Sequence, residues 1–150
     1  MSTAHAKLSA SSAHRWLHCP GSVAASEKIP ARSSFAADEG SAAHELAEIA
    51  LNAGKTDCSY LIGQTLPDNN AFTVTREMAG YVNEYLHTIK MIGGEQWYER
   101  RVDFSAWVPD GFGTSDCIAH SGKTLYVIDL KYGKGLPVEA YENPQGILYA

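Results

Sequence analysis

The sequence predicts an α/β domain in which a central mixed sheet is flanked by helices. Apolar residues recur with the period of a helix in the N-terminal part of the chain, and from Gln96 the period changes to that of a strand. The length of 150 residues and the hydrophobic content of 45% suit one domain with one core. We therefore expect a single domain over 1–150, with a helical part over about 1–94 and a sheet over about 95–135.

A short first helix is expected over 8–19. Ser9 or Ser11 can cap its N-terminus, and Pro20-Gly21 closes it. A loop that contains Pro30 and Ser33-Ser34 is expected before the next helix.

Two longer helices are expected next, with a polar, turn-rich stretch over 56–70 between them. The helix over about 36–52 has a stripe of small and aliphatic residues at helical spacing, and Gly54 is placed to end it. The helix over about 74–91 has an apolar face that includes Tyr81, and we expect it to be scaffold. The stripe of the first of these helices consists of Ala43, Leu46, Ala47 and Ala50.

Three strands and a final helix are expected in the rest of the chain. The strands span 97–104, 112–119 and 124–131. The helix, expected over 143–150, starts with an asparagine cap and a proline in its first turn. The sequence ends inside this helix, so we expect the fold to lack a C-terminal part.

The residues suited to chemistry concentrate in the hairpin of the last two strands. Asp129 and Lys131 are two positions apart, so they point to the same face of the strand, about 7 Å apart. If Ser121-Gly122 is a two-residue turn, Asp116 lies opposite Val127 and diagonal to Asp129. A slip of one residue would turn Asp116 to the other face.

Asp116, Asp129 and the backbone carbonyl of Leu130 offer oxygen ligands of the kind that Mg²⁺ or Mn²⁺ prefers. Lys131 can orient or help to deprotonate an attacking water, while a divalent ion stabilises the transition state of phosphodiester hydrolysis. The alternative is a solvated strand face with alternating charges. Against it, Asp129 follows the apolar run 125–128, which is typical of an interior strand. A charged side chain at the end of such a strand is costly unless it is paired or binds a ligand.

Five short motifs occur in a fixed order along the chain. They are Gly40-x3-His44, Glu99, Gly113-x2-Asp116, Asp129-Leu130-Lys131 and Gln145-x3-Tyr149. Their order and spacing resemble those of the RecB-like branch of the PD-(D/E)XK nuclease superfamily. More narrowly, Leu8-Ser-Ala-Ser, Cys19-Pro20-Gly21-Ser22, Gly113-Thr-Ser-Asp116 and Asp129-Leu-Lys-Tyr-Gly-Lys-Gly135 resemble a phage-associated family of inferred nucleases whose biological role is unassigned.

This resemblance implies a restriction-endonuclease-like core and metal-dependent cleavage of DNA, by exonucleolytic processing in phage recombination, repair or replication. It implies that Asp116 and Asp129 are metal ligands and that Lys131 is the catalytic lysine. It also implies that His44 is an additional metal ligand, where the residue alone would suggest a histidine on a helix surface. A catalytically silent DNA-binding or assembly module with the same fold is the main alternative, and a remnant of an interrupted gene is a third.

Four further residues receive peripheral roles. The resemblance implies that Glu99 is a carboxylate just outside the metal ligands, although an exposed edge strand explains it as well. It implies that Gln145 and Tyr149 lie beside the site and touch the DNA or the metal-bound water, although Tyr149 alone suggests core packing. Lys134, in the glycine-rich exit from the last strand, is a candidate phosphate contact.

Cys19 corresponds to a cysteine that, in some relatives, joins three C-terminal cysteines around a [4Fe-4S] cluster. No cysteine follows Cys117 in this sequence, so we expect no cluster and a buried structural thiol at Cys19. The three cysteines contain no CxxC pair, which argues against a disulfide framework and a zinc site.

The formal net charge of -5 argues against a protein that coats nucleic acid through bulk electrostatics. It does not exclude a nuclease, because bound divalent ions supply local positive charge. No apolar run approaches the roughly 20 residues that span a bilayer. We expect a cytoplasmic protein of a bacterial host or prophage, with DNA as its partner, no membrane, and either a phage recombination or replication protein or a second copy as a further partner.

Overall fold

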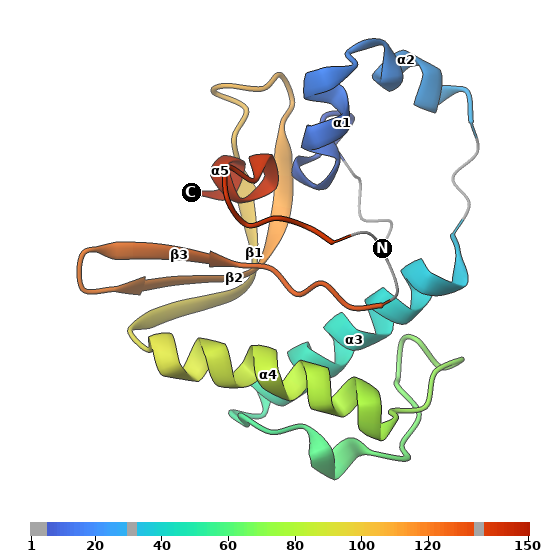
Figure 1. Ribbon diagram of the computed structural model, residues 1–150, viewed down its shortest axis with the longest axis vertical. Coiled ribbons are helices and arrows are strands. Elements are labelled where there is room, and N and C mark those ends of the chain that lie inside the picture. The colour runs from blue at the N-terminus through green and yellow to red at the C-terminus, as the bar shows by residue number, and fades with distance from the viewer. Residues whose placement is uncertain (1–5, 30–32, 134–136) are drawn as a thin grey trace.

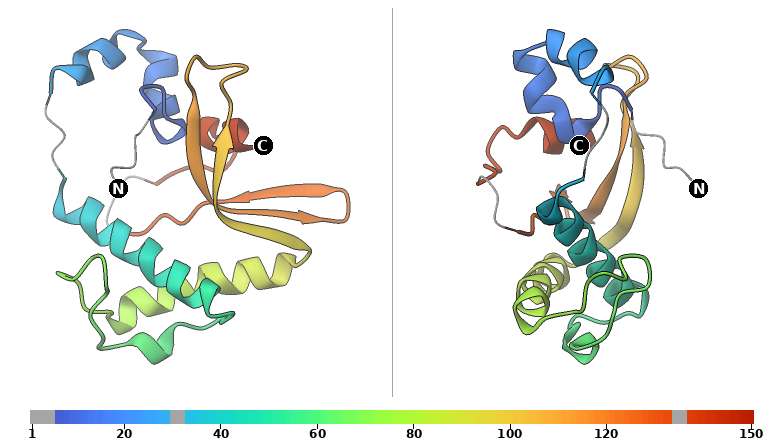
Figure 2. Two further views of the ribbon diagram at one scale, coloured as in Figure 1. Left: turned by 180° about the vertical axis from the view of Figure 1, so that it is seen from behind. Right: turned by 90° about the vertical axis from the view of Figure 1, so that its right-hand side faces the viewer.

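The computed structural model describes residues 6–29, 33–133 and 137–150. These residues form an α/β fold with one three-stranded antiparallel sheet in the order β1-β2-β3, which confirms the predicted class (Figure 1). The expected mixed sheet is not seen in the part of the chain that is described, because both strand pairs there are antiparallel. Helices α3 and α4 lie at one end of the sheet and the N-terminal helices at the other (Figure 2).

The N-terminal segment forms two helices where one was expected. A 3-10 turn, η1 (Ala10–Ser12), continues directly into α1 (Ala13–His18). Helix α2 (Gly21–Glu27) follows, and Pro20 is its N-cap residue. Proline tolerates the start of a helix because its nitrogen has no hydrogen that needs a partner there, so Pro20 separates two helices. The expected loop at Ser33-Ser34 is confirmed, because both residues are outside regular structure and α3 begins only at Phe35. Pro30, expected in the same loop, lies outside the described residues.

Helices α3 (Phe35–Asn52) and α4 (Arg76–Ile92) form where the apolar periodicity predicts them. Their N-caps are Ser34 and Thr75, whose side chains accept hydrogen bonds from Ala37 and Met78 nitrogens at 3.2 and 3.1 Å. The predicted stripe of α3 is buried. Tyr81 is the exception on α4, because its side chain stays 54% exposed and packs edge-on against Tyr132 with ring centroids 6.0 Å apart.

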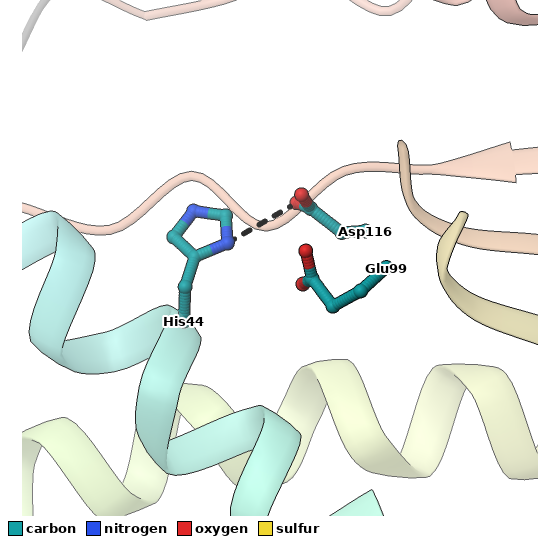
Figure 3. Close-up of side chains that lie close together, drawn as sticks. All are labelled: His44, Glu99 and Asp116. Carbon is teal, nitrogen blue, oxygen red and sulfur yellow. Dashed lines mark ion pairs between the residues drawn. The ribbon is translucent and has the colours of Figure 1, made fainter. Parts of the chain in front are cut away.

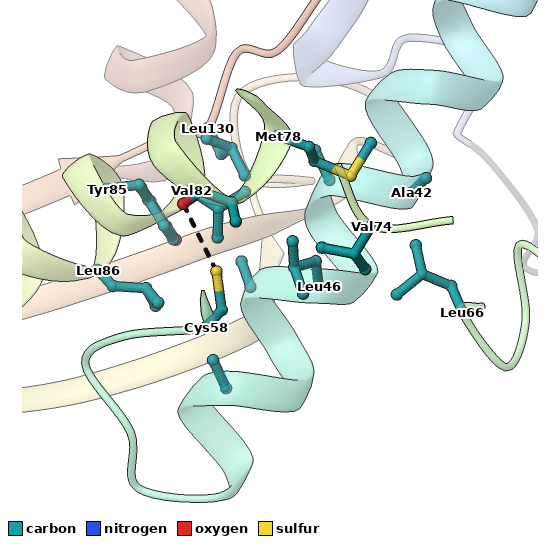
Figure 4. Close-up of a cluster of buried hydrophobic side chains, with 14 of the residues drawn as sticks. Ala42, Leu46, Cys58, Leu66, Val74, Met78, Val82, Tyr85, Leu86 and Leu130 are labelled. Carbon is teal, nitrogen blue, oxygen red and sulfur yellow. Dashed lines mark hydrogen bonds between the residues drawn. The ribbon is translucent and has the colours of Figure 1, made fainter. Parts of the chain in front are cut away.

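The main core lies between α3, α4 and the sheet (Figure 4). Between the two helices, the chain makes a 3-10 turn, η2 (Ser59–Leu61), and an isolated bridge between Thr65 and Thr73. Cys58 is fully buried there, and its thiol donates to the Ala79 carbonyl at 3.6 Å. The core also holds Leu130, so the residue between Asp129 and Lys131 is anchored in the apolar interior.

The sheet consists of β1 (Glu95–Asp103), β2 (Phe112–Ser121) and β3 (Thr124–Ile128). Ser121 pairs with Thr124, so the hairpin turns on Gly122, whose φ of 64° suits glycine, and Lys123. The pairing is therefore displaced by two residues from the expected register, and the faces are preserved because the side-chain period is two. One position beyond the Cys117–Ile128 pair, Asp116 lies opposite Asp129 instead of diagonal to it.

Strand β3 is shorter than expected and stands at the edge of the described sheet. It ends at Ile128, so Asp129 and Lys131 lie in the irregular segment just after it. Leu125 and Tyr126 are exposed by 45% and 37%, which makes the expectation of an interior strand wrong for this part of the run. The reason is that β2 is covered by β1 on its other side, while the end of the β2–β3 hairpin projects beyond the helices (Figure 1).

The final helix, α5 (Pro144–Tyr149), begins as predicted, with the Asn143 side chain accepting from the Gln145 and Gly146 nitrogens. It packs beside the sheet in a second, smaller core that contains Tyr149, Phe104, Val108 and Ala10. None of the helices in the described ranges is long and apolar enough to cross a membrane.

Candidate metal centre

Three side chains from three different elements converge beside the sheet. His44 comes from α3, Glu99 from β1 and Asp116 from β2, and one ligand atom of each lies within 4.8 Å of the others. The His44 Nδ1 atom is 3.5 Å from Asp116 Oδ2 (Figure 3). We refer to these three residues as the ligand cluster. An imidazole nitrogen with carboxylate oxygens is a donor set for a divalent cation, so the residue types fit a metal ion.

Glu99 enters the ligand cluster through an unusual backbone conformation. It lies between the pairs Tyr98–Cys117 and Arg100–Ser115, which sets it opposite Asp116 in the register of β1 and β2. Its φ is 46°, in the left-handed region that costs a non-glycine residue roughly 1–3 kcal/mol. Its carboxylate lies within 4.8 Å of the ligand atoms of His44 and Asp116, so Glu99 can reach the same ion as they do, and its expected place just outside the ligands stays a prediction.

Asp116 is the most enclosed carboxylate of the ligand cluster, with 12% of its side chain exposed. Its Oδ2 accepts a hydrogen bond from the Leu130 backbone nitrogen at 2.7 Å. Burial, and then the negative charge of Asp129, raise the pKa of Asp116, although His44, the Leu130 N–H and Lys131 oppose the rise. A crowded carboxylate of this kind is stabilised by a cation.

Glu99 shares this crowding. Although part of its side chain is exposed, loss of hydration beside the protein, together with the charges of Asp116 and Glu48, raises the pKa of Glu99 to about 7. In both carboxyl groups burial is the main cause of the raised pKa and neighbouring negative charge adds to it, so a nearby cation would favour the ionised form of both.

A second group, Asp129, Lys131 and Gln145, lies next to the ligand cluster. The Lys131 ammonium is 2.7 Å from Asp129 Oδ2 and donates to Gln145 Oε1 at 3.4 Å. The Gln145 amide nitrogen donates to Asp129 Oδ1 at 2.7 Å. Both oxygens of Asp129 are thus engaged, and the predicted roles of Asp129 and of the Leu130 carbonyl as metal ligands stay predictions. We refer to these three residues as the lysine group.

Tyr149 packs so closely against Gly113 that no larger residue fits at position 113 without a shift. A methyl group on Gly113 would overlap the Tyr149 hydroxyl and come within 3.0 Å of its ring. Tyr149 is buried, and burial first, with Asp129 and Asp116 adding, raises its pKa to about 12. Gly113 is therefore required so that α5, which carries Gln145, can approach β2.

Both groups open into one cleft of about 730 Å³. Its walls come from the N-terminal segment, α3, the loop at Asp68 and Asn69, the sheet and α5. Arg101 and Lys131 are the basic residues among the lining side chains. The acidic lining residues are Glu45, Glu48, Asp68, Glu99, Asp116 and Asp129. Acid outweighs base, so a polyanion can enter only with cations that offset this charge.

Two of the predicted residues, Lys134 and Cys19, are not among the described residues that line the cleft. Lys134 lies outside the described residues, so its predicted phosphate contact has no structural counterpart here. Cys19 is exposed at the C-cap of α1, and the expectation of a buried structural thiol is wrong. The short helix ends at His18, which leaves Cys19 and its neighbours in solvent.

A family model described as "Protein of unknown function (DUF2800)" matches residues 5–150. The match includes every residue of the ligand cluster and of the lysine group. No solved structure matches the chain. The family description assigns no activity.

Proposed function

The chain belongs to the DUF2800 family, and we propose that it is a metal-dependent nuclease that hydrolyses phosphodiester bonds of DNA with a PD-(D/E)XK type of site. The observation that carries the proposal is the position of Asp116. Its carboxylate faces His44 and Glu99 on one side and is tied to the 129–131 segment on the other. One residue thus joins a cation-binding donor set to an acid–lysine pair.

A divalent ion bound by the ligand cluster would supply positive charge at the reacting phosphate and lower the pKa of a bound water. His44, Glu99 and Asp116 would hold that ion. The residue types favour Mn²⁺ or Mg²⁺, since two of three donors are carboxylates. A cation also resolves the raised pKa values of Glu99 and Asp116, which is a reason for these groups to be crowded together.

The protein's own side chains contribute to the proposed reaction through the lysine group. Lys131, held by Asp129 and Gln145, places an ammonium next to the cleft, where it can orient a water molecule or neutralise a phosphate oxygen. Asp129 fixes that ammonium from one side, and Gln145 fixes Asp129 and Lys131 together. This arrangement limits the rotamers of a long side chain, which is the usual way to position a catalytic group.

We extend the proposal to exonucleolytic processing of DNA in phage recombination, repair or replication, as the motif resemblance implies. A restriction-endonuclease-like core follows from the same resemblance, and the antiparallel strands with a helix packed beside the site are compatible with it. The second candidate is a catalytically silent DNA-binding or assembly module. The acidic lining of the cleft favours the nuclease, because such a module would gain nothing from crowding carboxylates against its ligand.

Cleavage of end-labelled linear and closed circular DNA tests the proposal, with Mg²⁺, Mn²⁺ or EDTA. The variants are Asp116→Asn, Asp129→Ala and Lys131→Ala, and the matched control is Asp68→Asn, an exposed cleft carboxylate outside both groups. We expect metal-dependent cleavage that is lost in the three variants and kept in the control. The ratio of linear to circular cleavage reports exonuclease or endonuclease action. A folded wild-type protein that binds DNA in EDTA and never cleaves it would support the silent module instead.

A further inference from the structure

A second hollow adjoins the cleft on the far side of Lys131. It has a volume of about 540 Å³ and lies between α1 and the segment that leads into α5. Ser11, Lys131 and Gln145 line both spaces, so the hollow and the cleft share a wall at the lysine group. Nothing in the proposed chemistry uses this hollow.

The walls of the hollow differ from those of the cleft. Pro137, Val138 and Pro144 give it apolar surfaces, and Tyr141 contributes an aromatic ring that is 82% exposed. His14 adds a second flat ring from α1. A single exposed tyrosine is ordinary, but one that lines an apolar hollow beside a proposed reaction centre offers a stacking surface for a ligand.

With a cation bound in the cleft, as the proposed function requires, the phosphate of a nucleotide would favour the cleft and its base would favour the hollow. Glu139 and Glu142 line the hollow and disfavour a phosphate inside it. Lys131, at the junction, is the cation that a phosphate would meet. A nucleobase is flat, uncharged and apolar on its faces, and stacking on an aromatic side chain is how proteins hold unpaired bases.

We propose that this hollow is a nucleoside subsite, in which Tyr141 stacks on an unpaired base of the strand whose phosphodiester lies in the cleft. This inference rests on the proposed function and names its substrate more closely, as a single-stranded or frayed end. A base inside a duplex has both faces covered by its neighbours, so it reaches Tyr141 only after it leaves the stack. Lys131 and Gln145 line both spaces, and this adjacency to the proposed reaction centre favours this occupant over an unrelated apolar ligand.

The test follows the fluorescence of 2-aminopurine, a base analogue that is quenched on stacking, within a short single-stranded oligonucleotide. The full chain is titrated in Ca²⁺, as the wild type, Tyr141→Ala and the matched control Tyr141→Phe. We expect quenching and equal affinity for the wild type and Tyr141→Phe, and roughly tenfold weaker binding for Tyr141→Ala, as for other base–aromatic stacks. Because Tyr141 is exposed, its replacement leaves the cores intact.

Equal affinity of Tyr141→Ala and the wild type would overturn the subsite, as would equal quenching with the analogue inside a blunt duplex. DNA cleavage is measured separately on the same proteins. Cleavage with no dependence of binding on Tyr141 overturns the subsite and leaves the nuclease proposal standing. Quenching that depends on Tyr141 without cleavage overturns the nuclease proposal and supports a base-binding site.

Discussion

The Leu130 backbone N–H donates to the Asp116 carboxylate at 2.7 Å, which ties the segment after β3 to the middle of β2. Leu130 is itself fixed in the main core. Asp129 and Lys131, its two neighbours in sequence, are therefore held beside Asp116 although β3 has already ended. A buried leucine between two charged residues is what allows an irregular segment to present them at a fixed place.

Gln145 is expected to be a positioning residue for the lysine group. Its amide bridges Asp129 and Lys131, so Gln145→Ala should leave the fold intact and lower the rate of metal-dependent DNA cleavage by roughly 10- to 100-fold. Gln145→Glu should do no better, because a carboxylate repels Asp129. Single-turnover cleavage rates with a circular dichroism check measure this. Wild-type rates in Gln145→Ala would show that the bridge is dispensable.

Glu99 should make the metal-free protein less stable as the pH rises. Its pKa is raised from 4.5 to about 7, so the folded state binds more protons than the unfolded state between these values. This contribution to stability is present below about pH 4.5 and is lost as the pH rises through about 7. Glu99→Gln should therefore flatten the profile of unfolding free energy in EDTA and be more stable than the wild type above pH 7.

Glu84→Gln, at an exposed position of α4, is the control for that profile. If the free energies of unfolding of Glu99→Gln and the wild type change with pH in the same way between about pH 4.5 and 7, then the pKa of Glu99 is not raised.

Gly113→Ala should destabilise the packing of α5. The added methyl group meets the Tyr149 ring and hydroxyl, so the helix must shift at a cost of about 1–3 kcal/mol in the free energy of unfolding. The control is Gly80→Ala on α4, where the added methyl group meets open space and should stabilise the helix by about 0.5–1 kcal/mol. Chemical denaturation gives the free energy of unfolding of both variants. Equal changes in the two would show that Gly113 does not lie in close contact with Tyr149.

Glu45 should anchor the loop that forms one wall of the cleft. Its two carboxylate oxygens accept from the Asp68 nitrogen at 2.8 Å, and from the Asn69 nitrogen and side-chain amide at 2.9 and 2.8 Å. Glu45→Gln should speed amide hydrogen exchange at Asp68 and Asn69 and cost about 1 kcal/mol or more. Glu48→Gln, exposed one turn later, is the control and should leave those amides unchanged.

The same bonds predict a pH dependence of the opposite sign to that of Glu99. Partial burial works against ionisation of Glu45, but the hydrogen bonds from Asp68 and Asn69 outweigh it and lower the pKa. Stability from this anchor is thus present above the ordinary pKa of 4.5 and is lost as the pH falls through the lowered value. If the protection of the Asp68 amide from exchange, relative to an unfolded chain at the same pH, stays unchanged on acidification, then Glu45 does not anchor the loop.

Local signals predicted the parts of the fold that depend on local physics. The periodicity of α3 and α4 and the caps of α5 were visible in the sequence, because apolar stripes and capping side chains act within a few residues. The second N-terminal helix was missed, since Pro20 can end one helix or start another, and only packing decides. The exposure of Cys19 likewise depends on where α1 stops.

The site was predicted in its residues more than in its geometry. The motif order identified His44, Asp116, Asp129 and Lys131, and the structure brings all four to one cleft. The hairpin register was displaced by two residues, which spared the faces but changed a diagonal neighbour of Asp129 into an opposite one. The left-handed φ of Glu99 and its place opposite Asp116 could not be predicted, because they depend on the pairing of β1 with β2, which no local pattern encodes.

Binding of Mn²⁺, followed by electron paramagnetic resonance as the loss of the free-ion signal, shows whether His44, Glu99 and Asp116 form a metal centre. We expect one tight site in the wild type, which His44→Ala and Asp116→Asn weaken by at least about tenfold and Asp68→Asn leaves unchanged. Mn²⁺ that binds with equal affinity to the wild type and Asp116→Asn, or does not bind the folded wild type, would show that the ligand cluster is not a metal centre.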